Sequence, residues 1–278
     1  MWRRPFAEIP KSRLAVRAWR LALFALLVTL LSVVILRLDL LEIVPALATF
    51  AAALGCALLA MLLAFASFVP IWRDGAGGLR HALGAVVIAV LLLAYPVYLG
   101  TRALKLPQIN DITTDTTDPP RFGVLARLRP RGTDKYPGAA TAELQQKAYP
   151  DIIPLEVPAS ATATYEVALK LADRRKWRVV SEQGPTPGHN GVIEAVARTP
   201  IMGFRDDVVI RVTTIGPNAA RVDVRSASRY GAHDFGTNAA RIRKLLDDID
   251  DAIASAPEPK PEPNKPQPAK RPAPSARR

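Results

Sequence analysis

The sequence predicts two parts of different fold class: an N-terminal α-helical transmembrane bundle of three spans, followed by an α+β domain. The bundle is predicted from three long apolar runs, all within residues 1–105. The domain is predicted from short alternating strands and two amphipathic helices between residues 151 and 255. Their order, β-α-β-β-β-β-α, and the short connections between the last strands favour an antiparallel sheet packed on one face by two helices.

The apolar runs give spans at about residues 19–37, 46–69 and 82–100, near the roughly 20 residues that a helix needs to cross a bilayer. The first run is the shortest and has the length of a signal-peptide core. No small-residue cleavage site follows it, since Arg37, Asp39 and Glu42 come next. A retained helix is therefore expected, while the sequence alone leaves cleavage of this span open.

Basic residues predict the orientation of the spans. Several of them precede Leu21, and the Arg73–His81 loop between the second and third spans also carries arginines. Because cytoplasmic loops are enriched in Lys and Arg, the N-terminus is expected inside. Three spans then place everything after Thr101 outside the cytoplasm. The sequence thus predicts a multi-pass protein of the bacterial inner membrane with a periplasmic C-terminal domain, and the lipid bilayer as a partner.

The formal net charge of +12 belongs to the membrane part and the C-terminal tail. Residues 1–105 carry 11 Lys and Arg against 4 Asp and Glu, whereas residues 106–254 carry 20 against 19. Membrane topology therefore explains the charge better than nucleic-acid binding does. The apolar cores of the spans hold no ionisable residue, which favours an anchor over a transporter. Cys56 is the single cysteine and the three histidines are scattered, so no disulfide, zinc site or cofactor is expected.

Residues 106–150 are predicted to be an extended, turn-rich lead-in. Pro119-Pro120 and the Asp/Thr cluster before them argue against a regular element. One asparagine and three aspartates have the oxygen ligands that calcium prefers, but the glycine and terminal glutamate of a calcium loop are missing. Turn and capping roles are therefore expected for Asn110, Asp111, Asp115 and Asp118.

Residues 151–255 are predicted to form the α+β domain. Ser160 is expected to cap a helix to about Arg175, and Thr237 a helix to about Ser255. Strands are expected at Asp151–Val157, Trp177–Glu182, Val192–Thr199, Asp207–Ile215 and Ala220–Ser228.

Alternation along these strands predicts two unlike sheet faces. Val208, Ile210 and Val212 share one face, as do Val222 and Val224, and point towards the helices. The opposite face is charged and forms either a solvated ladder of salt bridges or a ligand-binding surface. Its members are Glu194, Arg198, Asp207, Arg211, Arg221, Asp223 and Arg225.

Several segments of this region match a known family. They are INDITTD at Ile109–Asp115 with Pro119-Pro120, Tyr149-Pro-Asp, IEA at Ile193–Ala195, FRDDVVIR at Phe204–Arg211, and VDVRSASRYGAHDFGTNAARIR at Val222–Arg243. On these segments the chain resembles DUF1499, a domain of unknown function, some members of which have membrane spans before the domain. The family has no settled activity, so the resemblance implies fold and topology rather than mechanism.

The passage from the last strand into the last helix, Arg221–Arg243, holds the candidate functional residues. Its glycines permit tight turns, the helix N-terminus favours an anion, and arginines donate bidentate hydrogen bonds to phosphate or carboxylate. This pattern predicts a binding or scaffolding module that recognises an anionic lipid or cell-wall polymer. The candidate ligand-binding residues are Arg225, Ser226, Ser228, Arg229, Gly231, Asp234, Gly236, Asn238 and Arg241.

Two alternatives remain for this signature. In the structural one, Asp234 pairs with Arg225 or Arg229 and ties the loop to the sheet. In the enzymatic one, Ser226 or Ser228 acts with His233 and Asp234 in an envelope hydrolase. The enzymatic alternative is weaker, because adjacent His and Asp side chains point in different directions and no nucleophile elbow surrounds either serine.

The last segment, residues 256–278, is a Pro/Lys-rich tail. It has no hydrophobic residue larger than alanine, so it has nothing to bury and is expected to be disordered. Loose contact with anionic polymers and a role as an inert spacer are both compatible with this composition.

Overall fold

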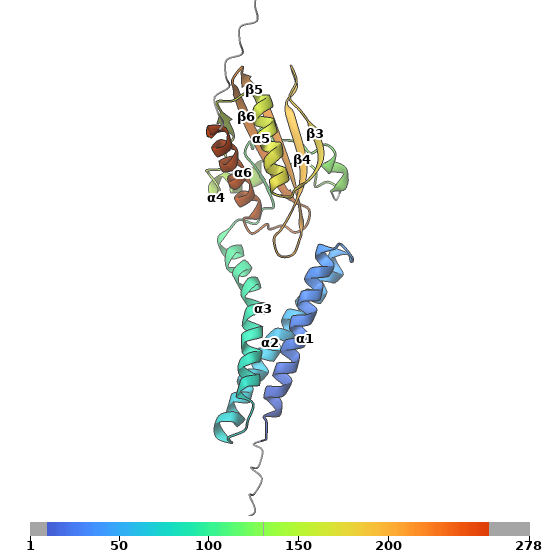
Figure 1. The fold of residues 1–278 in the computed structure, drawn as a ribbon, viewed down its shortest axis with the longest axis vertical. Helices are drawn as coiled ribbons and strands as arrows, with labels where there is room; N and C mark the ends of the chain where they lie inside the picture. The colour runs from blue at the N-terminus through green and yellow to red at the C-terminus, as the bar shows by residue number, and fades with distance from the viewer. Residues whose placement is uncertain (1–9, 130, 256–278) are drawn as a thin grey trace, which may run out of the picture.

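The computed structural model describes residues 10–129 and 131–255, so the predicted tail lies outside the described residues. Figure 1 shows three long helices at one end of the molecule and a domain built around a sheet at the other. The helices are α1 (Arg13–Arg37), α2 (Ile43–Arg73) and α3 (Leu79–Lys105). The domain contains β1 (Asp111–Thr113), the 3₁₀ helix η1 (Leu125–Leu128), α4 (Ala139–Ala148), β2 (Leu155–Val157), α5 (Ala161–Arg174), β3 (Arg178–Gln183), β4 (Gly191–Arg198), β5 (Arg205–Gly216), β6 (Ala219–Ser228) and α6 (Thr237–Ala254).

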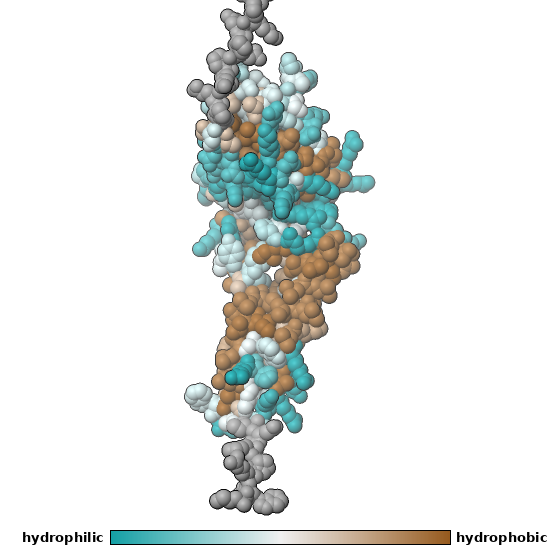
Figure 2. Space-filling view, in the orientation of Figure 1, coloured by the Kyte–Doolittle hydropathy of each residue, from teal (hydrophilic) through white to brown (hydrophobic). Residues whose placement is uncertain are grey.

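The three long helices pack through small residues. Each is long and apolar enough to cross a membrane, and each contains one of the predicted apolar runs. Small side chains let helix backbones approach closely, which matters in a bilayer because lipid tails are as apolar as leucine. Larger apolar side chains point outwards and form the hydrophobic band in Figure 2. The helix interfaces bury Ala15, Ala18, Ala22, Ala25, Ala46, Ala53, Ala57, Ala60, Ala64, Ala82, Ala85 and Ala89.

The domain is an antiparallel sheet covered on one face by α5 and α6, as predicted (Figure 1). The strand order is β1-β6-β5-β4-β3, and β2 also pairs with β6. The predicted order β-α-β-β-β-β-α is confirmed by β2, α5, β3, β4, β5, β6 and α6. Val208, Ile210 and Val212 share a core with Ile242 and Leu245 of α6, so the predicted apolar face is the one that the helices cover.

The two domain helices begin differently. The Ser160 hydroxyl accepts a hydrogen bond from the Ala163 amide at 3.3 Å, which confirms the predicted cap of α5. The prediction that Thr237 caps α6 is wrong, because Thr237 is already helical. Gly236 occupies the N-cap position with a left-handed backbone and has no side chain to bind the helix amides.

The segment before residue 150 is more regular than the sequence analysis expects, since it holds β1, η1 and α4. Strand β1 pairs with β6, with Ile112 opposite Ser226. Its outer edge is covered by Gln145 of α4. The Gln145 side-chain amide accepts from the Thr113 N–H at 3.0 Å and donates to the Thr113 carbonyl at 2.7 Å. A three-residue strand completed by a distant glutamine has no periodic signal, so pattern analysis misses it.

Candidate functional site

Arg225 lies at the centre of the predicted anion site and is 1% exposed. Its guanidinium donates to both carboxylate oxygens of Asp111, at 3.0 and 2.7 Å. It also donates to the carbonyls of Pro120 and Asp134 at 3.2 Å each, and the Phe122 ring lies 4.4 Å from the guanidinium carbon. A buried charge needs partners of this kind. The turn or capping role expected for Asp111 is therefore wrong, because this residue lies in β1 and its carboxylate forms the ion pair with Arg225.

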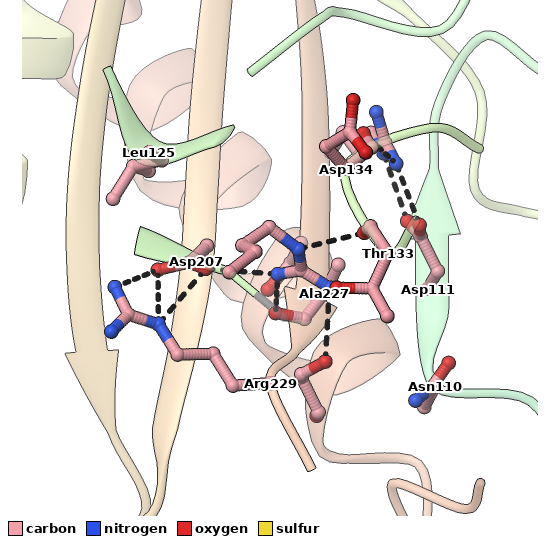
Figure 3. A network of polar contacts seen from close by, with 12 residues as sticks. Asn110, Asp111, Leu125, Thr133, Asp134, Asp207, Ala227 and Arg229 are labelled. Atoms are coloured by element: carbon pink, nitrogen blue, oxygen red, sulfur yellow. Dashed lines mark hydrogen bonds and ion pairs between the residues drawn. The ribbon is translucent and has the colours of Figure 1, made fainter. Parts of the chain in front are cut away.

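Arg229 makes a second buried pair, with Asp207 of β5 (Figure 3). Its Nε lies 3.0 Å from both Asp207 oxygens, and its terminal nitrogen lies 2.7 Å from one of them. Arg129 donates to the same carboxylate at 2.9 Å and to the carbonyls of Ala227 and Ser228 at 3.1 Å each. Because two guanidiniums share this carboxylate, an anionic ligand would have to displace Asp207.

Arg241 ties the first turn of α6 to the sheet. It donates to Asp206 of β5 and to Asn238 at 2.5 Å each, and to the Ser226 hydroxyl at 2.9 Å. The Ser226 hydroxyl donates to the Asn238 carbonyl oxygen at 2.7 Å, and the Asn238 amide donates to the Ser228 hydroxyl at 3.0 Å. These polar groups satisfy one another, so their first effect is to hold α6 against β5 and β6.

Asp234 caps α6 instead of pairing with an arginine. One of its oxygens accepts from the Gly236 amide and the other from the Asn238 amide, at 2.8 Å each. Gly231 and Gly236 have φ values of +80° and +76°, which glycine adopts without a Cβ penalty. Burial raises the pKa of Asp234 above its ordinary value, and the two amide hydrogen bonds oppose this shift. The predicted lock, in which Asp234 pairs with Arg225 or Arg229, is therefore wrong: Asp111 and Asp207 pair with these arginines, and Asp234 caps the helix start.

The residues of the hydrolase alternative do not form a triad. The Nδ1 of His233 accepts a hydrogen bond from the Phe235 amide at 2.9 Å, so it does not donate to a carboxylate. Both oxygens of Asp234 are used by helix amides, and both serine hydroxyls belong to the Arg241 network. The serine–histidine and histidine–aspartate hydrogen bonds that activate a nucleophile are therefore missing from the described residues.

Most of the charged face of the sheet is covered. The predicted ladder includes a cross-strand pair between Arg211 and Asp223, but Asp223 is buried, so this pair is not solvated. Phe122 and Leu125 pack on this face against Val209. Beneath them Glu194 is 4% exposed and accepts hydrogen bonds from the amides of residues 123, 124 and 125, at 2.8, 3.1 and 2.7 Å. A sheet carboxylate thus caps the start of η1, as an acid at a helix N-terminus does. The lead-in folds back over the sheet as a second covering layer.

Aspartates of the lead-in also form ion pairs with arginines of the sheet. Arg211 donates to Asp118 at 2.7 Å and to Asp223 at 3.0 Å, and Arg221 donates to Asp115 at 2.8 Å. The carboxylates of Asp115 and Asp118, whose oxygens could also bind calcium, are therefore already paired with arginines. Within residues 10–129 and 131–255, no group of three or more His, Cys, Asp or Glu could hold a metal ion.

A family match identifies the domain. The model described as "Protein of unknown function (DUF1499)" matches residues 111–249, which is half of the chain. The chain belongs to the DUF1499 family. The match begins in β1, so the segment that covers the charged face is part of the family's domain.

Solved structures and curated proteins add little to this family match. An uncharacterised protein from Bacillus thuringiensis is 13% identical, over 36% of this chain and 96% of that chain, with a TM-score of 0.23. The protein XoxI from Bacillus cereus is 11% identical, over 37% and 93%, also with a TM-score of 0.23. No curated protein matches the chain.

The DUF1499 domain meets the helices through its β4–β5 turn, residues 199–204. Met202 of this turn is buried against Leu36 of α1 and Ala46 of α2. Arg198 and Arg205, at the two ends of the turn, reach the carboxylate of Asp39 at 2.8 and 2.5 Å. The domain is therefore docked on the loop between α1 and α2.

A cavity of about 230 Å³ lies between the base of the DUF1499 domain and the helix ends. Its walls come from the start of α2, the end of α3, the β4–β5 turn and the loop between β6 and α6. Ser228, Gly231 and Asp234 of the predicted anion site line it, and the other predicted site residues do not. The signature therefore has two roles: its arginines build the domain, and its loop forms one wall of a cavity next to the membrane helices.

Proposed function

We propose that this protein is a membrane-anchored scaffolding or binding module of the bacterial cell envelope, with its DUF1499 domain on the non-cytoplasmic side of the inner membrane. The observation that carries the proposal is the use of the signature side chains. The three arginines of the signature, Arg225, Arg229 and Arg241, form ion pairs with aspartates. The start of α6 is held by the two signature serines, Asn238 and Asp234. A signature used in this way favours a rigid presenting domain over a catalytic centre.

The arrangement of the helix ends supports the proposed orientation. The start of α1 and the loop between α2 and α3 meet at the end of the bundle far from the domain (Figure 1). The Ser12 amide donates to the Gly77 carbonyl at 2.7 Å, and the Gly77 amide donates to the Pro10 carbonyl at 3.1 Å. The basic residues near both segments thus gather at one end, as expected for the cytoplasmic side.

A pair of reporter fusions after Ser255, beyond the end of α6, tests the orientation. Alkaline phosphatase, which needs an oxidising compartment, is expected to be active there, and a fluorescent protein that folds only in the cytoplasm is expected to be dark. The opposite pair of results would overturn the orientation. A fusion in the Asp74–Gly78 loop should give the reverse readings and serves as the control within the same chain.

A second experiment separates scaffolding from anion recognition at the signature. Arg229→Ala leaves Asp207 with fewer buried partners, so the scaffolding role predicts a lower melting temperature. Under the same role, the wild-type protein shows no saturable binding of glycerol phosphate by calorimetry. Saturable binding that Arg229→Ala abolishes without changing the melting temperature would replace the scaffolding role by anion recognition.

A further inference from the structure

The cavity at the base of the domain is open to an amphiphile rather than to a water-soluble ligand. Leu47 of α2 and Leu99 of α3 lie within the predicted spans, and both line it. Beside the cavity, Val44 is 77% exposed on α2, and Leu40 and Leu41 are exposed in the preceding loop. This apolar surface continues the hydrophobic band of the bundle up to the domain (Figure 2). The apolar lining of the cavity and the apolar surface of the helices are therefore neighbours, which suits an acyl chain.

His233, one of the side chains that line the cavity, also has a polar atom that lacks a partner among the described residues. Because the Nδ1 of His233 accepts from the Phe235 amide, the neutral ring carries its proton on Nε2. That Nε2 is buried and has no hydrogen-bond partner among the residues that the structure describes. The ring itself is held in place by stacking on Phe235 at 4.6 Å. A buried donor left unpaired is unfavourable, and a ligand oxygen would satisfy it.

A larger hollow of about 630 Å³ adjoins the cavity and is more polar at its rim. The two share Ile43, Phe204, Arg205 and Tyr230. The larger hollow adds Asp39, which is paired with Arg205, and Glu42, which makes no ion pair in the described part of the chain. An apolar compartment thus opens towards one arginine and one free carboxylate.

We propose that these adjoining hollows bind one membrane phospholipid with a zwitterionic headgroup. An acyl chain occupies the smaller cavity, and the headgroup lies in the larger hollow. The volume of about 230 Å³ is below the roughly 300–1,000 Å³ of pockets that enclose a whole drug-sized ligand, so it suits part of one chain. Arg205 and the His233 Nε2 donate to phosphate or ester oxygens, and Glu42 receives the headgroup ammonium. This inference rests on the proposed role as a membrane-anchored binding module.

Photolabelling of the full-length protein tests the site. The protein is reconstituted in nanodiscs of phosphatidylethanolamine and phosphatidylglycerol that contain a phosphatidylethanolamine with a diazirine in one acyl chain. After irradiation, peptide mapping is expected to find the label on residues 199–206 and 228–237. These segments belong to the domain, so label on them reports the cavity rather than the lipid-facing surface of the helices.

Two tryptophan substitutions on α3 give a matched comparison. Leu99→Trp fills the cavity and is expected to lower labelling of the two domain segments roughly tenfold or more, because the chain has lost its space. Leu91→Trp is the control, since Leu91 is 71% exposed on the same helix and does not line the cavity. Equal labelling of the domain segments in both variants, at equal melting temperature, would overturn the proposal.

Two further measurements test which headgroup is bound and whether the acyl chain belongs to a phospholipid or to a free fatty acid. His233→Phe keeps a ring to stack on Phe235 but removes the donor, and it is expected to reduce labelling, while Leu91→Trp leaves it unchanged. Unlabelled phosphatidylethanolamine should compete for the site. Competition by phosphatidylglycerol alone, or by oleate alone, would overturn the zwitterionic phospholipid as the occupant. The reporter fusions do not depend on lipid binding. If they give the expected topology but the cavity is not labelled, the phospholipid site is wrong while the proposed membrane-anchored role stands.

Discussion

The bundle and the domain bury different residues, although one chain forms both. The helix interfaces of the bundle bury mainly alanines, and many of the leucines on these helices face outwards. The domain buries isoleucine, valine and leucine between its sheet and two helices, and buries arginine–aspartate pairs on the opposite face of the sheet. The difference follows from the solvent. In lipid, burying a large apolar side chain contributes little free energy, so the close approach of helix backbones determines how the helices pack. In water, burial of apolar side chains drives folding.

The bundle and the domain also differ in where their charges lie. No ion pair joins one long helix to another among the described residues, and the junction pairs connect Asp39 to the domain. The domain places Asp207, Arg225 and Arg229 in nearly complete burial, and it does so with several hydrogen bonds to each. Buried ion pairs are weak net stabilisers but costly to break from one side. The domain is thus sensitive to loss of a charge, and the bundle to added volume.

The largest expected effect is in the domain, at Asp207. Asp207→Ala leaves the buried guanidiniums of Arg129 and Arg229 without their carboxylate. The free energy of unfolding of the domain is expected to fall by about 3–5 kcal/mol, the usual consequence of an uncompensated buried charge. Urea unfolding of the full chain in detergent micelles, followed by circular dichroism, measures this change.

Asp118→Asn is the matched control for Asp207→Ala. The Asp118 side chain also pairs with an arginine, Arg211, but it is 68% exposed. Water screens such a pair, so its loss is expected to cost about 0–1 kcal/mol. Similar costs for the two substitutions would mean that burial does not decide the strength of these pairs, and the contrast drawn for the domain would be wrong.

The next effect is in the bundle, at Gly84 of α3. A Cβ at this position would overlap the Trp19 ring of α1, so Gly84→Leu forces the two helices apart. Overpacking of this kind costs typically about 1–3 kcal/mol. We expect a lower midpoint for thermal loss of the helical signal in detergent. Gly55→Leu on α2 is the control, because nothing lies within 4 Å of its added Cβ, and a loss as large as that at Gly84 would argue against volume as the cause.

Sequence patterns predict the helices and strands of both regions, because each pattern repeats over many residues. The apolar runs of the helices and the alternation around Val208, Ile210 and Val212 are signals of this kind. The missed parts lack such repeats. β1 is only three residues long, and its edge is completed by Gln145. Its pairing with β6 and its contact with Gln145 both join segments that lie far apart in the chain, which no local pattern encodes.

The candidate site was predicted by residue type but not by partner. The signature arginines are predicted to be anion ligands, and the structural alternative pairs Asp234 with Arg225 or Arg229. The structure gives them Asp111 and Asp207, and adds Arg129 from the lead-in. Many arginines and aspartates in one domain allow many pairings, and only the strand register selects among them. The cavity at the helix ends was not predicted, since it exists only where two separately folded regions meet.

The smallest expected effect is at the junction of the two regions, where Asp39 meets Arg198 and Arg205. Burial acts to raise the pKa of Asp39, but the two arginines outweigh it and hold the pKa below its ordinary value. A carboxylate with a depressed pKa in the folded state stabilises that state above the unfolded pKa of 3.8, and this contribution is lost as the pH falls through the lowered value. The docking of the domain is therefore expected to weaken only in acid.

Asp39→Asn removes this contribution at neutral pH. Because the Asp39 side chain is 42% exposed, the pair is screened and its loss is expected to cost about 0–1 kcal/mol. The melting midpoint of the full chain should differ from that of the wild type at pH 6, and the difference should shrink as the pH drops below 3.8. Asp74→Asn, at the other end of the bundle and without an ion pair in the described residues, controls for loss of a charge alone. A difference at Asp39 that stays constant down to pH 3, or an equal change at Asp74, would show that the carboxylate of Asp39 does not tie the domain to the helices.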